Sequence, residues 1–148
     1  MKNKDLHALL NSVGIKPPSQ FINFEIKNIS FNSKNVEPGT LFLGLIGTKL
    51  DGGLYWKDAI YNGAEAAIIS KTAERNCAEI NYERVLVLEE PLDYIFGQII
   101  SEFWNRPSRK LKLIGVTGTN GKTTITFLLE YLLKKLGKKV ALFGTLYN

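Results

Sequence analysis

The sequence GVTGTNGKTT, residues 115–124, lies between an apolar run and a segment with helical periodicity. The run LKLIGVT, residues 111–117, predicts a buried strand, and leucines and isoleucines recur every three or four positions from Ile125 to Leu136. KKVALFGT, residues 138–145, predicts a further strand, and Gly137 suits the end of the helix. This part of the chain is therefore expected to form strand, loop, helix and strand, which is one βαβ unit.

Glycines and a lysine in a loop between a strand and a helix are typical of a phosphate-binding site. Gly118 and Gly121 allow a tight turn whose backbone N–H groups converge on an anion at the start of the helix. Lys122 would supply a positive charge to the outer phosphates, and the Thr123 hydroxyl suits a magnesium ion that bridges them. The loop departs from the general pattern G-x-x-x-x-G-K-[ST], because Val116 stands where the first glycine is expected. Nucleotide binding is still favoured over an ordinary strand-to-helix turn.

The preceding part of the chain alternates short apolar runs with helical periods, which predicts an α/β fold. The expected strands are residues 24–30, 40–47, 65–70 and 84–90, and the expected helices lie near residues 6–13, 56–64 and 91–104. NRPSRK, residues 105–110, separates two apolar segments and marks a boundary, so we expect domains at 1–108 and 109–148. One βαβ unit cannot bury both faces of its sheet, so the second is expected to be the truncated start of a larger nucleotide-binding domain.

Composition limits the other classes of function. The chain has 148 residues and a net charge of +5, which favours anionic ligands but is too small to indicate nucleic acid. With His7 and Cys77 as the single histidine and cysteine, neither a metal cluster nor a catalytic triad is expected. The N-terminal residues lack an unbroken apolar stretch, and no segment suggests membrane insertion, so we expect a cytoplasmic protein. Oligomeric state is not predicted.

The loop and its surroundings resemble one known family. TGTNGKTT after an apolar strand resembles the ATP site of the Mur ligases and of the related folylpolyglutamate synthetase. FWNRPSRKLKLIGVTGTNGKTT and GKKVALFGTLYN are similar to stretches of one branch, the UDP-N-acetylmuramyl-tripeptide synthetases. ISFNSKNVEPGTLFLGLIGTKLDG is similar to the substrate segment of that branch, D-S-R-x-V-x-P-G-D-L-F-V-A-L-x-G-x-x-x-D-G-H. The resemblance spans the chain from about Ile29 to its end.

The resemblance implies an N-terminal fragment of an ATP- and magnesium-dependent ligase of peptidoglycan synthesis. Such an enzyme phosphorylates the D-glutamate carboxylate of UDP-N-acetylmuramoyl-L-alanyl-D-glutamate, and the amine of an amino acid attacks the acyl phosphate. The residues that would bind ATP are Gly118, Thr119, Asn120, Gly121, Lys122, Thr123 and Thr124, with Lys122 catalytic and Thr123 on magnesium. Those that would bind the precursor are Phe31 and Ser33 at the uridine, and Thr48, Lys49 and Leu50 near the diphosphate.

The same resemblance implies that the chain alone is inactive, because further magnesium ligands and the domain that selects the amino acid lie outside it. Asn32 and Lys34 stand where the family has an acid and an arginine, so the salt bridge within that motif is lost or rebuilt. Gly53 stands where a histidine is common.

Two alternative functions remain open from the sequence, a non-catalytic module that binds a uridine nucleotide and a related ligase such as folylpolyglutamate synthetase. A P-loop kinase or switch protein is disfavoured by Val116 and by the α/β domain that precedes the loop.

Overall fold

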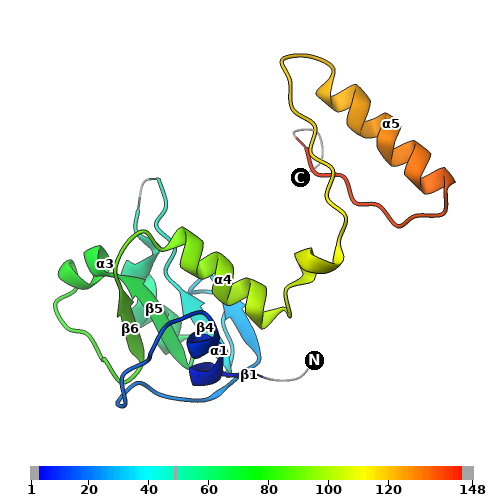
Figure 1. Ribbon diagram of the computed structural model, residues 1–148. Helices are drawn as coiled ribbons and strands as arrows, with labels where there is room; N and C mark the ends of the chain where they lie inside the picture. Colours follow the sequence, from blue (N-terminus) through cyan, green and yellow to red (C-terminus); the bar gives the residue numbers. More distant parts are fainter. Residues whose placement is uncertain (1–3, 49, 145–148) are drawn as a thin grey trace. The chain divides into compact units, whose positions relative to one another are not determined.

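Residues 4–48 and 50–144 are described by the structure, a computed structural model. The chain divides into two units, Met1–Lys110 and Leu111–Asn148 (Figure 1). The sequence placed the domain boundary between residues 108 and 109, close to this division.

Four parallel strands form the centre of the first unit (Figure 1). They are β3 (Asn28–Ser30), β4 (Thr40–Leu43), β5 (Ala66–Ser70) and β6 (Val85–Leu88), in the spatial order β3-β4-β5-β6. Every residue of β4 and β5 is buried, as expected for strands that are covered on both faces. The prediction of an α/β fold is therefore confirmed.

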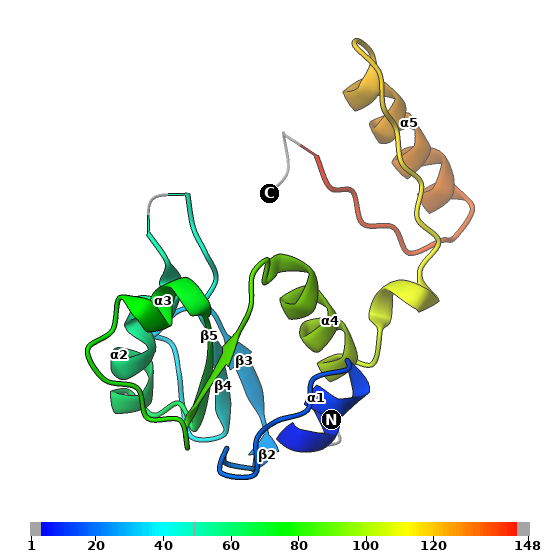
Figure 2. The ribbon, with the colours of Figure 1, turned by 60° about the vertical axis from the view of Figure 1, so that its left-hand side comes forward.

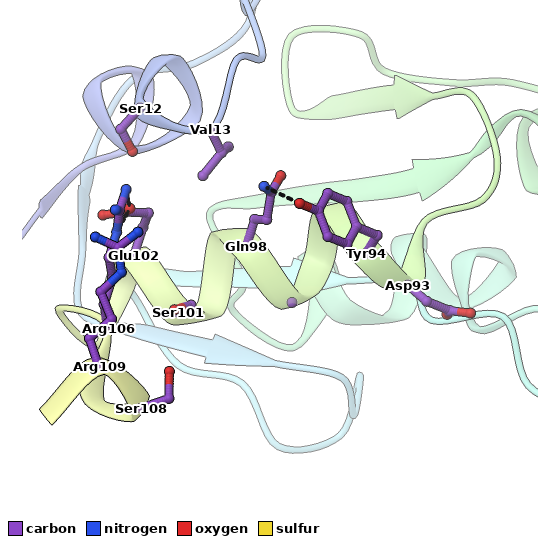
Figure 3. A pocket seen from close by; sticks show the side chains of 11 residues that line it. Ser12, Val13, Asp93, Tyr94, Gln98, Ser101, Glu102, Arg106, Ser108 and Arg109 are labelled. Carbon is purple, nitrogen blue, oxygen red and sulfur yellow. Dashed lines mark hydrogen bonds and ion pairs between the residues drawn. The ribbon is translucent and has the colours of Figure 1, made fainter. Parts of the chain in front are cut away.

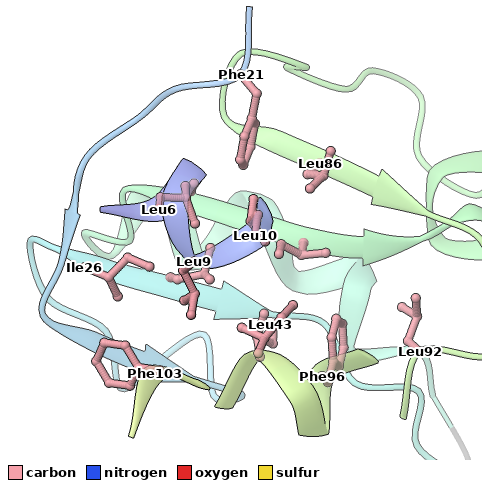
Figure 4. Close-up of a cluster of buried hydrophobic side chains, with 14 residues drawn as sticks. Leu6, Leu9, Leu10, Phe21, Ile26, Leu43, Leu86, Leu92, Phe96 and Phe103 are labelled. Carbon is pink, nitrogen blue, oxygen red and sulfur yellow. The ribbon is translucent and has the colours of Figure 1, made fainter. Parts of the chain in front are cut away.

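Helices cover both faces of this sheet (Figure 2). On one face, α1 (Leu6–Ser12) and α4 (Asp93–Phe103) pack against alternate strand residues such as Leu43 and Ile68, and Figure 4 shows this cluster. On the other face, α2 (Trp56–Tyr61) and α3 (Lys71–Arg75) enclose a smaller cluster that includes Phe42 and Ile69. Successive side chains of β4 and β5 point to opposite faces of the sheet, so each strand contributes residues to the apolar cluster on either face.

Two details of the first unit differ from the sequence prediction. Residues 24–30 form two short strands instead of one: β2 (Glu25–Ile26) pairs antiparallel with β1 (Lys4–Asp5), whereas β3 joins the parallel sheet. The strand predicted for residues 40–47 ends at Leu43, because the Leu45 N–H donates to the Leu43 carbonyl oxygen at 3.0 Å and turns the chain out of the ladder. The short helices α3, η1 (Gly52–Tyr55) and η2 (Pro107–Lys110) were not predicted.

In the second unit, the predicted helix is present as α5 (Lys122–Lys135). Gly137 follows it with a φ of 72°, and its N–H and that of Lys138 close the last turn on the carbonyls of Lys134 and Leu133. The strands predicted for residues 111–117 and 138–145 are wrong within the described residues, which run to Gly144 and form no strand there. A parallel pair of strands is stable only with neighbours that extend its ladder and cover its faces, and this segment of chain offers one helix.

Trp56 carries the one buried side-chain polar atom without a hydrogen bond among the described residues. Its ring is 5% exposed within the Phe42 cluster, and the indole N–H finds no acceptor there. An unpaired buried donor costs about 1–3 kcal/mol.

We expect Trp56→Phe to change the free energy of unfolding by less than about 1 kcal/mol, because the removed donor offsets the lost ring volume. Phe42→Leu, which removes volume from the same cluster without removing an unpaired donor, is the control and should destabilise by about 1–3 kcal/mol. Chemical denaturation of both variants measures the difference. A larger loss in Trp56→Phe than in Phe42→Leu contradicts the explanation.

Candidate functional site

The carboxyl ends of the parallel strands carry most of the precursor-binding residues selected from the sequence. Phe31 and Ser33 follow β3, and Thr48 and Leu50 lie in the loop after β4. In open α/β sheets, ligands bind outside this edge, where loops from neighbouring strands meet. Lys49, the remaining residue predicted near the diphosphate, lies outside the described residues.

The loop after β4 is a tight hairpin that needs glycine at its base. The Gly44 N–H donates to the Ile68 carbonyl at 2.8 Å, and the Gly52 N–H donates to the Leu45 carbonyl at 2.9 Å. A Cβ atom on Gly44 would lie 2.4 Å from the Cα atom of Gly53. The backbone after β4 and the start of η1 thus approach so closely that backbone packs directly on backbone, which fixes the path of the loop.

Asp51 fastens the returning strand of this hairpin to the sheet. Its Oδ1 accepts a hydrogen bond from the Gly53 N–H at 2.8 Å, and its Oδ2 accepts one from the Ser70 hydroxyl at 2.6 Å. Ser70 is fully buried at the end of β5, and its Oγ also accepts from the Ala73 N–H, which caps α3. The hairpin, β5 and α3 therefore share one hydrogen-bond network at the ligand-binding edge.

Thr48 and Leu50 lie beyond this network near the tip of the hairpin. Both are exposed, and 61% of Leu50 is accessible to solvent. Leu45 and Ile46 are also exposed apolar residues of the same loop. The hairpin therefore presents an open surface on which a ligand could lie.

Glu90 anchors α3 from the end of β6. Its Oε1 accepts from the Thr72 N–H at 3.1 Å, and the hydrogen bonds from the side chain and backbone of Thr72 lower the pKa of Glu90. A carboxylate with a lowered folded-state pKa adds stability above its unfolded pKa, and that stability is lost as the pH falls through the folded value.

We therefore expect that lowering the pH from 7 to about 3 reduces the free energy of unfolding less in Glu90→Gln than in the unchanged protein, since glutamine does not titrate. Denaturant titrations at several pH values in this window give the comparison. Glu89→Gln serves as the control, because the Glu89 carboxylate accepts no hydrogen bond from a described residue. Equal pH dependence in Glu90→Gln and the unchanged protein argues against this role of Glu90.

The turn after β3 forms without the salt bridge of the family motif. Asn32 Oδ1 accepts from the Lys34 N–H at 2.9 Å, and the Ser30 hydroxyl donates to the Asn32 carbonyl at 3.0 Å. Lys34 is exposed and makes no ion pair with any described residue. The Asn32 side chain, whose amide mimics a backbone turn, and the Ser30 hydroxyl thus shape the turn without an ion pair.

A hollow of about 400 Å³ lies between this turn and α2. It is lined by Phe31, Asn32, Ser33, Lys34, Phe42, Gly52, Tyr55 and Asp58. The structure thus brings the two predicted uridine residues, Phe31 and Ser33, into one hollow. Tyr55 and Asp58 were not selected from the sequence, where an aromatic and an acidic residue in a helical period look like ordinary helix residues.

The phosphate loop lies in the second unit and leaves its donors available. None of the backbone N–H groups from Gly118 to Thr124 donates to a described acceptor. Gly118 and Gly121 have φ values of 146° and 77°, which residues with a side chain rarely adopt, and Gly121 is the N-cap of α5. The Lys122 ammonium donates to the carbonyl oxygens of Gly118 and Thr119 and so lies over the loop. This arrangement suits a bound phosphate group.

A second hollow in the first unit contains none of the predicted residues (Figure 3). Its volume is about 470 Å³, and it lies between the end of α1 and the outer side of α4. Glu102 pairs there with Arg106, and Asp93 and Arg109 add one charge of each sign. The mixed charges indicate no preference for an anion or a cation.

Across the described residues, no cluster of histidine, cysteine and carboxylate side chains could hold a metal ion, and no helix is long and apolar enough to span a membrane.

Comparisons with known proteins agree on one family. The family model described as Mur ligase family, catalytic domain, matches residues 25–105. The UDP-N-acetylmuramoyl-L-alanyl-D-glutamate–2,6-diaminopimelate ligase of Prochlorococcus marinus subsp. pastoris is 69% identical over 100% of this chain, and the similarly named protein of Synechococcus elongatus is 43% identical over 97% of it. A crystal structure of MurF from Acinetobacter baumannii matches 92% of the chain at 25% identity, with a TM-score of 0.58. The chain spans 29% of the length of the first relative and 29% of the MurF chain.

Proposed function

Because the chain belongs to the Mur ligase family, we propose that it is part of an ATP-dependent ligase that joins 2,6-diaminopimelate to UDP-N-acetylmuramoyl-L-alanyl-D-glutamate. The choice of diaminopimelate rests on the names of the relatives, since the sequence alone leaves the third amino acid open. The proposal includes a cytoplasmic location and small-molecule substrates. The structural observation that carries it is the phosphate loop, with its unpaired N–H groups at the start of α5.

The loop residues would hold the terminal phosphates of ATP. The N–H groups from Gly118 to Thr124 would donate to phosphate oxygens, and Lys122 would exchange the carbonyls of Gly118 and Thr119 for a phosphate. The Thr123 hydroxyl makes no hydrogen bond with a described residue and would be free to contact magnesium. When bound, ATP with magnesium supplies the phosphoryl group that activates the D-glutamate carboxylate toward an amine.

The first unit would hold the uridine diphosphate end of the precursor. Phe31 and Ser33 line the hollow beside β3, where the uridine would lie. Thr48 and Leu50, together with Lys49, would lie along the diphosphate on the hairpin after β4. This placement uses the edge of the sheet at which α/β proteins usually bind ligands.

Separate titrations of the 148-residue chain with the UDP-precursor and with ATP test the proposal. We expect the chain to bind both ligands. We expect it to catalyse no amide-bond formation, because it spans only 29% of the relative's length. Binding of the precursor without ATP would favour the non-catalytic uridine-nucleotide module instead. Amide-bond formation by the chain alone would refute the expectation that the chain binds the two ligands without catalysing the reaction.

A further inference from the structure

One face of α2 borders the hollow beside the β3–β4 turn. Tyr55 and Asp58 are three residues apart and both line the hollow. Asn62, four residues after Asp58, donates from its side-chain amide to the Ser33 carbonyl at 2.9 Å. Residues three and four apart share a helix face, so the Asn62 contact holds the face of Asp58 against the turn of Ser33.

The groups in this hollow are available to a ligand. Ser33 is 9% exposed, and its hydroxyl makes no hydrogen bond with any described residue. Phe31 and Tyr55 expose 46% and 43% of their surface. The Asp58 carboxylate makes no hydrogen bond or ion pair within the described part of the chain. Two accessible aromatic rings beside a free carboxylate and a nearly buried hydroxyl can bind a flat molecule that carries an N–H donor.

The lining of the hollow suits the base of a uridine nucleotide better than the diphosphate. Its ammonium group, on Lys34, is offset by the Asp58 carboxylate, whereas two aromatic rings can stack on a base, so the base belongs in the hollow and the diphosphate belongs on the hairpin after β4. Aromatic rings stack on any base and therefore do not select uracil. Selection requires a group that reads the edge of the base.

We propose that the Asp58 carboxylate accepts a hydrogen bond from N3–H of a uracil that stacks on Tyr55. The inference rests on the proposed function and adds to it the two residues that recognise the base. Uracil carries a hydrogen on N3, whereas cytosine carries a lone pair there, which the carboxylate would repel. Asp58 thus discriminates between the two pyrimidines, while Tyr55 supplies affinity for both.

Titration of the 148-residue chain with UDP and with CDP tests this inference. We expect UDP to bind about tenfold more tightly than CDP, because a hydrogen bond to a charged group contributes roughly that factor. In Asp58→Asn the ratio should fall toward one, because a carboxamide can donate as well as accept. Tyr55→Leu should weaken UDP and CDP equally, by about five- to tenfold, without changing the affinity for inorganic pyrophosphate.

Asp93→Asn provides a matched control, because Asp93 is also an acidic residue in the first turn of a helix but lies on α4, in the other hollow. It should keep the ratio of the unchanged chain. Equal binding of UDP and CDP, or a ratio that survives Asp58→Asn, overturns the role of Asp58 and leaves the proposed function standing. A Tyr55→Leu chain that binds UDP normally overturns the stacking. Failure of the unchanged chain to bind either nucleotide overturns the inference together with the precursor site of the proposed function.

Discussion

Replacing Gly44 with alanine is expected to destabilise the first unit by about 2–3 kcal/mol, the upper part of the range for overpacking, because the neighbouring atoms are rigid backbone. The added Cβ would lie 2.4 Å from the Gly53 Cα atom and 2.7 Å from the Gly53 nitrogen. These are backbone atoms, which cannot rotate away as the end of a side chain can. The hairpin would have to separate, and the hydrogen bonds of Asp51 with Gly53 and Ser70 would be strained with it.

Gly97→Ala is the matched control for this prediction. Gly97 lies inside α4, and no atom apart from its chain neighbours and the backbone of its own helix lies within 4 Å of a Cβ built there. Alanine should therefore stabilise the protein by about 0.5–1 kcal/mol, since glycine weakens a helix interior by that amount. Chemical denaturation of both variants should give shifts of opposite sign. A Gly44→Ala protein as stable as the unchanged one would show that the hairpin does not require the close backbone approach.

The sequence predicted the first unit well where apolar patterns were long or continuous. Every residue of β5 is buried, and the run that contains it was recognised from its apolar character alone. The early end of β4 was not predictable, because it depends on the hydrogen bond from the Leu45 N–H to the Leu43 carbonyl, which the apolar pattern of residues 40–47 does not reveal. α3 was missed for a similar reason, since its start is fixed by Ser70, which is also bound to Asp51 from another segment.

The second unit shows the opposite error. LKLIGVT and KKVALFGT have strand-like composition, but pattern alone cannot supply the neighbouring strands that a parallel ladder requires. The helix between them could be predicted without knowledge of its tertiary contacts, because the residues that set its ends are adjacent in the sequence. Gly121 precedes Lys122 at its start, and Gly137 closes its last turn.

The candidate precursor site was predicted in part. Phe31 and Ser33 were selected because they lie in one continuous stretch of sequence that resembles the family motif. Tyr55 and Asp58 meet them through tertiary contacts, among them the hydrogen bond from Asn62 that links α2 to the Ser33 turn. The same contact helps to hold the turn, together with the hydrogen bonds of Asn32 and Ser30, although Asn32 and Lys34 cannot form the usual salt bridge.

In the ligase of which the chain is proposed to be part, Lys122→Met is expected to lower the rate of amide-bond formation by about 100-fold or more, as loss of one charged group at a transferring phosphoryl costs. Methionine keeps most of the length of the side chain and removes the ammonium that contacts the Gly118 and Thr119 carbonyls. Because charge develops on the phosphoryl group in the transition state, the turnover number should fall more than the affinity for the UDP-precursor. Steady-state kinetics with each substrate varied in turn separates the two effects.

Lys135→Met controls for the loss of a lysine from the same helix. Lys135 lies in the last turn of α5, where its ammonium is 5.6 Å from the centre of the Tyr131 ring, away from the phosphate loop. Its replacement should leave turnover within about twofold, since an exposed cation–π contact contributes only about 0.5–1 kcal/mol to stability. Both lysines are exposed, so neither variant should unfold. If Lys122→Met turned over as fast as Lys135→Met, the ammonium over the loop would have only a structural role, and the phosphate loop would no longer support ATP-dependent ligation.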